Sequence, residues 1–175
     1  MAKWYSLLNK WRADRNITSP SNKFIQMVDE EIDEHHNAIS MDEQDEFIDS
    51  LADICILTYN QACLESVKLD LSKSLEGTID DIETILHNQY IFGEDNTDTL
   101  QAIYSITYYI LITNGYIPEL VYKKASYHIL ERPQLPEQFH RWKANPELAQ
   151  QEKWQKDPTF EQQLPDYSTC RGKSR

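Results

Sequence analysis

Apolar residues recur every three or four positions along most of the chain, which is the spacing of one face of an α-helix. Six segments carry this pattern, and the predicted helices span residues 4–15, 21–40, 42–69, 71–90, 96–114 and 118–132. Only four glycines are present, whereas β-folds need many tight turns. The pattern therefore predicts an all-α fold, an antiparallel helical hairpin or bundle of about five to six helices.

Polar stretches and prolines separate the predicted helices. Residues 18–21 offer N-cap side chains for the second helix, and Pro133 and Pro136 end the last one. Beyond that point the chain is rich in proline and glutamine. We therefore expect a helical catalytic domain over residues 1–136 and an extended tail over residues 137–175. Isolated aromatic residues should dock this tail on the body or on a neighbouring subunit: Trp142, Trp154 and Phe160.

Carboxylates interrupt the apolar faces of the second and third predicted helices. In the second helix, Glu31 and Glu34 share one face with Met27 and Ala38. In the third, a second acidic face is formed by Glu46, Asp49 and Asp53. The last of these lies within a run that is apolar on nearly every side. Because an unpaired carboxylate is costly to bury, such a group should protonate, pair with a cation or bind a metal.

The two acidic faces would meet across a helical hairpin. A turn near Ser40 would place three pairs of residues opposite each other: Glu34 with Glu46, Glu31 with Asp49, and Met27 with Asp53. Like charges repel in this arrangement, so stability alone would not favour it. Mg²⁺ prefers oxygen ligands and resolves the repulsion. We expect Asp29 and Asp33, on the other side of the helix, to face solvent.

These residues also carry a resemblance to a known family. Residues 30–34 match the EExxE signature of the MazG-like all-α NTP pyrophosphohydrolases, which include dimeric dUTPase, dCTP pyrophosphatase and phosphoribosyl-ATP pyrophosphohydrolase. Residues 46–49 resemble the ExxD element of the following helix, and residues 49–54 are similar to its phage-type form. Ser50 departs from the pattern, because many relatives have Glu there. Two pairs are therefore candidates to complete the motif: Glu46 with Asp49, or Asp49 with Asp53.

The resemblance implies metal-dependent hydrolysis of a nucleoside triphosphate to the monophosphate and pyrophosphate. Bound metal would polarise the phosphoryl oxygens and activate a water molecule. Glu31 and Glu34 would be catalytic as ligands, and Glu30 would orient the water as general base. The implied metal ligands are Glu31, Glu34, Glu46, Asp49 and Asp53. The implied cofactor is Mg²⁺, for which Mn²⁺ should substitute.

The same resemblance suggests where the substrate is held. The segment that includes Trp11 and Asn16 is similar to one that these enzymes place near the base, and the last predicted helix resembles the one that supplies cations to the phosphates. The candidate substrate-binding residues are Trp11, Asn16, Lys23, Lys124 and Arg132. The phage-type motif favours an enzyme that shapes a nucleotide pool, with a purine such as dGTP or GTP as substrate. A pyrimidine or phosphoribosyl nucleotide stays open as an alternative.

Net charge and cysteine content limit which binding partners and which cellular compartment we expect. The formal net charge is −12, with 29 acidic and 17 basic residues, so the chain should not bind nucleic acid. We find no apolar run long enough for a membrane span and no signal-peptide pattern at the start. Cys55, Cys63 and Cys170 show no framework spacing, which favours a reducing compartment, the cytoplasm, or the host cytoplasm for a phage protein. We expect a homodimer or homotetramer.

Two other classes of protein must be weighed against this interpretation. A ferritin-like di-iron site needs Glu-x-x-His motifs on two helices. Here only Asp33 and His36 approach that spacing, and the third predicted helix has no histidine. The other alternative is a non-catalytic helical module that binds a partner through its aromatic residues. Such a module would show no effect of Mg²⁺ or Mn²⁺ on its thermal stability.

Overall fold

The computed structural model describes residues 3–14, 16–131 and 164–172. Within these ranges the chain is helical and has no strand, although Tyr116 and Arg171 form an isolated antiparallel bridge. The predicted all-α class is therefore confirmed. The elements are α1 (Trp4–Asp14), α2 (Phe24–Met41), α3 (Gln44–Leu64), α4 (Ile79–Gln89), α5 (Thr97–Thr113), α6 (Pro118–Glu131) and the 3₁₀ helix η1 (Ser168–Cys170).

Local backbone chemistry makes two of the helices shorter than predicted. The third predicted helix ends at Leu64 and does not continue to residue 69, because Ser66 has a left-handed backbone with φ of 62°. The fourth begins at Ile79, not at residue 71. Its start is fixed by a capping box, in which Thr78 Oγ1 accepts the Asp81 amide and Asp81 Oδ2 accepts the Thr78 amide.

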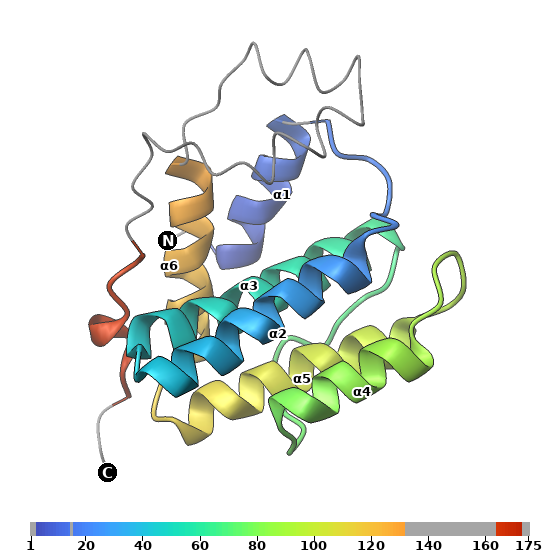
Figure 1. Ribbon diagram of the computed structural model, residues 1–175. Coiled ribbons are helices and arrows are strands. Elements are labelled where there is room, and N and C mark those ends of the chain that lie inside the picture. Colours follow the sequence, from blue (N-terminus) through green and yellow to red (C-terminus); the bar gives the residue numbers. More distant parts are fainter. Residues whose placement is uncertain (1–2, 15, 132–163, 173–175) are drawn as a thin grey trace, which may run out of the picture. The chain divides into compact units, whose positions relative to one another are not determined.

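Helices α2 and α3 form the central antiparallel hairpin (Figure 1). Its turn lies at Asp42, which has φ of 57°, and at Glu43, whose amide donates to the Ala38 carbonyl at 2.9 Å. The predicted turn near Ser40 is therefore wrong, and the predicted facing pairs shift with it. His35 faces Ser50 across the hairpin, with 3.0 Å between Nδ1 and Oγ. A turn at Ser40 would have placed His35 opposite Asp45.

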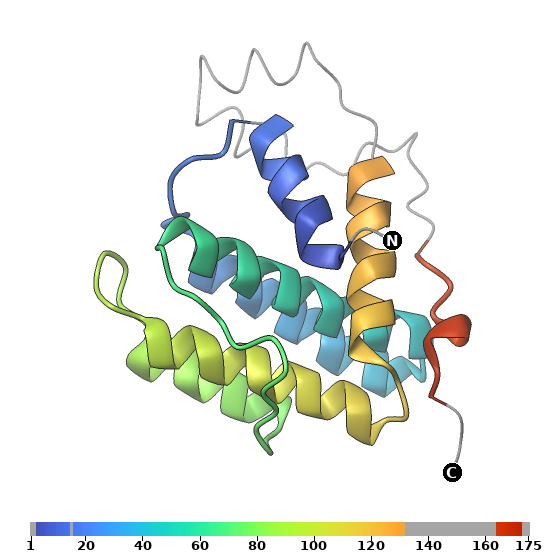
Figure 2. The ribbon, with the colours of Figure 1, turned by 180° about the vertical axis from the view of Figure 1, so that it is seen from behind.

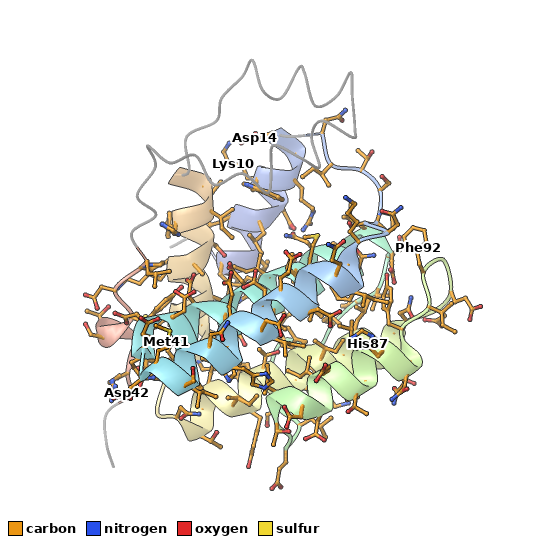
Figure 3. All side chains as sticks on the ribbon, in the orientation of Figure 1. Lys10, Asp14, Met41, Asp42, His87 and Phe92 are labelled. Carbon is orange, nitrogen blue, oxygen red and sulfur yellow. The ribbon has the colours of Figure 1, made fainter. Side chains whose placement is uncertain are left out.

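A second hairpin, formed by α4 and α5, packs against the first, with α5 on α3 and α4 on α2 (Figures 1 and 2). The interface is a continuous core in which Ile54, Ile82 and Ile103 are fully buried. At its edge His87 of α4, labelled in Figure 3, lies 2.9 Å from Asp29 of α2, measured from Nε2 to Oδ1. Asp29 therefore contacts α4 and does not simply face solvent. Because α4 covers the side of α2 that carries Asp29, the opposite side of α2 faces away from α4.

A buried polar network fixes the open end of the α2–α3 hairpin. Gln61 of α3 accepts the Ser21 amide at 3.0 Å and donates to the Tyr90 hydroxyl at 2.8 Å. That hydroxyl donates to Glu65 at 2.5 Å, and Asn96 donates to the other oxygen of the same carboxylate at 3.2 Å. Because these residues come from four separate segments, the network sets where α2 starts relative to the end of α3.

Helices α1 and α6 are joined to the central hairpin through aromatic rings. The Trp4 ring lies 4.9 Å from Tyr59 of α3 and 5.2 Å from Tyr122 of α6, centroid to centroid, in edge-on geometry. Trp4 and Tyr122 are buried. Such pairs add to the free energy gained from burying the rings.

The C-terminal segment, residues 164–172, runs beside the closed end of the α2–α3 hairpin in both ribbon views (Figures 1 and 2). Contacts divide the chain into two units, residues 1–130 with 165–175 and residues 131–164, so most of this segment belongs to the helical unit. The boundary expected at residue 136 stays a prediction. The aromatic residues expected to dock the tail lie outside the described residues: Trp142, Trp154 and Phe160. None of the helices described is long and apolar enough to cross a membrane.

Candidate active site

Glu31, in the middle of α2, lies at the centre of a group of carboxylates. Burial, and after it the charges of Asp53, Glu34, Asp49 and Glu30, raise the pKa of Glu31 from 4.5 to about 9. We call these five residues the acidic cluster. Of the two α3 residues, Asp53 has the larger effect, in agreement with the shifted register. Glu31 and Glu34 form no ion pair within the described residues, so no lysine or arginine there offsets the repulsion between them.

The acidic cluster ranges from buried to exposed positions. Asp49 is buried at 8% exposure, Asp53 and Glu31 are half-buried, and Glu34 is exposed. Glu30 is half-buried, and its Oε1 accepts a hydrogen bond from the Gln26 side-chain Nε2 at 3.5 Å. The cluster therefore spans from the hairpin interior to solvent, so a ligand could reach its outer members directly. Glu46, half-buried near the start of α3, lies one turn nearer the closed end than Asp49.

Asp49 is held by a residue that the sequence analysis did not single out. The Tyr167 hydroxyl, from the C-terminal segment, donates to Asp49 Oδ1 at 2.5 Å. Burial and the charge of Asp49 raise the pKa of Tyr167 far above that of an exposed tyrosine, so the phenol stays protonated and acts as the donor. No local sequence signal could have revealed this contact, because 118 residues separate the two partners.

Ser50, where many relatives of the resembled family have Glu, is buried in the hairpin and faces His35. Its hydroxyl donates to the Phe47 carbonyl at 3.0 Å and lies at 3.0 Å from the imidazole. Burial, and then the charge of His36, lower the pKa of His35 from 6.5 to about 4, so the imidazole is neutral near pH 7. A neutral imidazole and a hydroxyl form a satisfied polar pair. The departure at Ser50 thus leaves Asp49 and Asp53 as the α3 carboxylates next to Glu31.

The donor set of the acidic cluster suits a hard divalent cation, because every candidate ligand atom is a carboxylate oxygen. The high pKa of Glu31 points the same way, since a nearby cation would lower it. Within the described residues, no three His, Cys, Asp or Glu side chains converge closely enough to hold a metal. Mg²⁺ commonly uses only one or two carboxylates together with substrate phosphates, so complete convergence is not required.

The candidate substrate-binding residues lie on several elements. Trp11 is half-buried on α1, and Asn16 is exposed with a left-handed backbone at φ of 52°. Lys23 precedes α2, and its amide donates to Ser21 Oγ at 3.2 Å. Lys124 of α6 donates to the Asp166 carbonyl and to Thr169 Oγ1, so it anchors the C-terminal segment. Arg132 lies outside the described residues.

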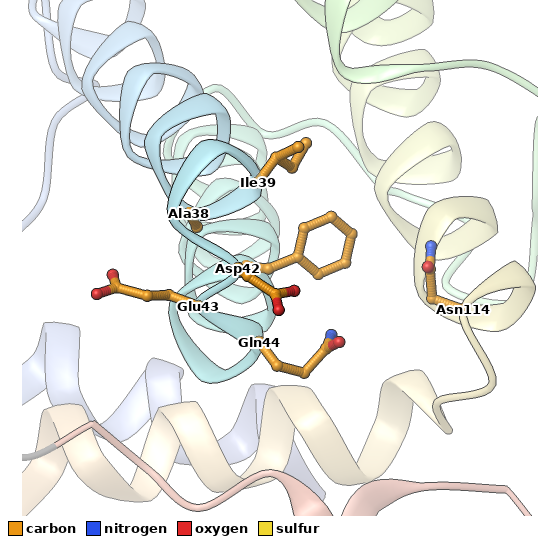
Figure 4. Close-up of a pocket in the computed structure, with 7 residues that line it drawn as sticks. Ala38, Ile39, Asp42, Glu43, Gln44 and Asn114 are labelled. Carbon is orange, nitrogen blue, oxygen red and sulfur yellow. The ribbon is translucent and has the colours of Figure 1, made fainter.

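Two hollows open on the surface away from Glu31. One, of about 190 Å³, lies at the closed end of the hairpin, where Asp42 and Gln44 turn toward Asn114 and Glu43 turns the other way (Figure 4). The other, of about 240 Å³, lies between α6 and the C-terminal segment and is lined by Lys123 and Lys124, among others. Pockets for drug-sized ligands enclose roughly 300–1,000 Å³. Neither hollow alone is large enough for a nucleotide.

Comparison with known families identifies the part of the chain that carries the acidic cluster. Residues 10–76 match the model of the family phosphoribosyl-ATP pyrophosphohydrolase, which belongs to the MazG-like all-α NTP pyrophosphatase superfamily. The match covers less than half of the chain but contains α2 and α3 completely. It supports the resemblance drawn from the sequence at the level of the superfamily; the phage-type assignment stays a prediction. Searches of curated proteins and of solved structures gave no significant match.

Proposed function

We propose that this protein is a Mg²⁺-dependent pyrophosphohydrolase that cleaves a nucleotide between its α- and β-phosphates. The observation that carries the proposal is Glu31, whose pKa is raised to about 9 by burial and by four neighbouring carboxylates. Such repulsion is unfavourable unless a cation binds between the carboxylates and offsets it. The match of residues 10–76 supports the same reaction class, because the family is named for pyrophosphate hydrolysis.

In this mechanism some carboxylates bind the cation and another acts as the general base. The candidate ligands are Glu31, Glu34, Asp49 and Asp53, of which one or two would hold the cation together with the substrate phosphates. When bound, Mg²⁺ would polarise the phosphoryl oxygens and neutralise part of the polyphosphate charge. Glu30 immediately precedes Glu31 and lies about 100° from it around the helix, so it can face the attacking water rather than the cation. Glu30 accepts a proton from that water while the water oxygen forms a bond to the α-phosphorus. The bond between the α-phosphorus and the departing pyrophosphate breaks.

A phosphoribosyl nucleotide is the first candidate substrate. The name of the matched family specifies phosphoribosyl-ATP, and phosphoribosyl nucleotides are among the alternatives that the sequence resemblance leaves open. The preference for a purine triphosphate such as dGTP or GTP has no further support from the fold or the family match. Both substrate classes carry the same triphosphate, so the cluster would act on the same bond in each. Contacts to the base and sugar would decide between them.

The activity is tested by measuring pyrophosphate release from phosphoribosyl-ATP and from the common NTPs and dNTPs. We expect release from one or a few of them with Mg²⁺ or Mn²⁺ and none with EDTA. Glu34→Gln and Asp53→Asn should each lower kcat/KM at least about 100-fold, because a lost ligand removes several kcal/mol of charge stabilisation. Asp33→Asn, which changes an exposed acid on the same helix, should leave the rate unchanged. Folded wild-type protein that releases pyrophosphate from none of these substrates would overturn the proposal.

The oligomeric state is a separate part of the proposal. We propose that a second copy of the chain completes the substrate site, in a homodimer or homotetramer, as the resemblance of the acidic motif to the MazG-like enzymes implies. Size-exclusion chromatography with light scattering should give a mass of two or four chains at micromolar concentration. A monomer that is fully active at the same concentration would contradict this expectation.

A further inference from the structure

The Tyr167 hydroxyl links the C-terminal segment to the acidic cluster through a hydrogen bond to Asp49. The donor is fully buried, and the acceptor, Asp49 Oδ1, belongs to a residue that is 8% exposed. A buried phenol loses free energy when its O–H has no partner. Here it takes that partner from within a group of mutually repelling carboxylates, and not from a backbone carbonyl.

The C-terminal segment is anchored so that Tyr167 is held in place. The Ile117 amide donates to the Cys170 carbonyl at 2.9 Å, and the Gly172 amide donates to the Gly115 carbonyl at 2.8 Å. On the other side of Tyr167, Lys124 holds the Asp166 carbonyl. These contacts join the segment to α6 and to the α5–α6 connection. The hydroxyl is therefore presented by a fixed backbone and not by a free chain end.

We propose that Tyr167 is a positioning residue that holds the Asp49 carboxylate for a divalent cation. The inference rests on the proposed function, because it takes Asp49 as a metal ligand. The phenol donates to Oδ1 of Asp49, and this hydrogen bond fixes the orientation of the carboxylate within the cluster. Partners of this kind orient metal ligands in many proteins.

The chemistry of the phenol explains why a tyrosine suits this place. Repulsion between Glu31 and Asp49 would favour rotation of Asp49 away from Glu31. Lysine or arginine would also hold the carboxylate, but its positive charge would compete with the cation. A neutral phenol donates a hydrogen bond and leaves the negative charge of the cluster intact. Tyr167 therefore fixes Asp49 without weakening the attraction for a divalent ion.

The test is the affinity for Mn²⁺, measured by EPR of the free ion, in the full-length wild type and in Tyr167→Phe. We expect the Kd for Mn²⁺ to rise on the order of 10-fold, because loss of such an orienting partner weakens metal binding by about that factor. Tyr122→Phe is the matched control. Its hydroxyl is equally buried, finds no hydrogen-bond partner within the described residues, and lies beside the Cys55 thiol. Tyr122→Phe should leave the Kd unchanged.

The outcomes separate this inference from the proposed function. A Tyr167→Phe protein that is folded by circular dichroism and binds Mn²⁺ as tightly as wild type would show that the hydroxyl is only structural, while the metal site stands. Absence of Mn²⁺ binding in the wild type would overturn both. Should Tyr167→Phe fail to fold, Thr169→Val loosens the anchoring by Lys124 and keeps the phenol. It should then raise the Kd by a smaller factor, and an unchanged Kd would count against the inference.

Discussion

Glu31→Gln should abolish the metal-dependent activity and at the same time stabilise the metal-free protein. The carboxylate is required by the cation, so we expect a loss of at least about 100-fold in kcat/KM. Without metal, Glu31 must keep a proton that the unfolded chain would release, because its pKa is raised to about 9. Glutamine has the shape of that protonated acid and carries no such cost. The free energy of unfolding at pH 7.5 should rise by about 1–3 kcal/mol.

Thermal unfolding in EDTA measures the second effect. For a domain of this size the expected gain corresponds to an increase of about 3–10 °C in Tm. Asp33→Asn is the control, because it makes the equivalent change from acid to amide at an exposed position on the same helix. Should Glu31→Gln prove less stable than wild type in EDTA, Glu31 would be an ordinary structural residue and the repulsion described above would be absent.

The metal-free protein should become less stable as the pH rises from about 6.5 to 9. Glu31 has a folded pKa of about 9 and an ordinary value of 4.5, so between these limits the folded state binds more protons than the unfolded state. Stability then falls with increasing pH. His35 has the opposite effect: its folded pKa is about 4, so its contribution is lost as the pH falls from 6.5 to 4. Of these two residues, only Glu31 therefore makes the stability depend on pH above 6.5.

Denaturant unfolding at several pH values, with EDTA and with saturating Mg²⁺, checks this dependence. With Mg²⁺ the decline above pH 6.5 should disappear, because the cation stabilises the ionised cluster. Glu31→Gln should also remove the decline in EDTA. An identical pH dependence in wild type and Glu31→Gln would mean that another group causes it.

The acids of the cluster could be identified from the sequence because they interrupt apolar helical faces. Glu31 and Asp53 each lie where burial without a partner is unfavourable, and both belong to the cluster in the structure. The predicted register of the α2–α3 hairpin, however, is wrong, because the register depends on where the turn lies. It depends on the left-handed backbone of Asp42, which moves the turn beyond Ser40. A polar residue after a helical pattern does not reveal such a conformation.

The remaining parts of the site depend on contacts between distant segments. His35 and Ser50 meet only because the hairpin register places them opposite each other. Tyr167 reaches Asp49 from the far end of the chain, and its neighbours in sequence show no helical pattern that would mark it as buried. Periodicity predicts which face of one helix is buried, but it does not identify the partner that covers that face.

Proton release on Mg²⁺ binding tests the central claim most directly. Isothermal titration calorimetry of the metal-free protein at pH 7.5, in buffers with different ionisation enthalpies, counts the protons released. Because Glu31 is protonated at this pH and must ionise to bind a cation, we expect about one proton per bound Mg²⁺ in wild type. Glu31→Gln should release none. Mg²⁺ binding without proton release, or no binding in the wild type, would contradict the assignment of the acidic cluster as the metal site.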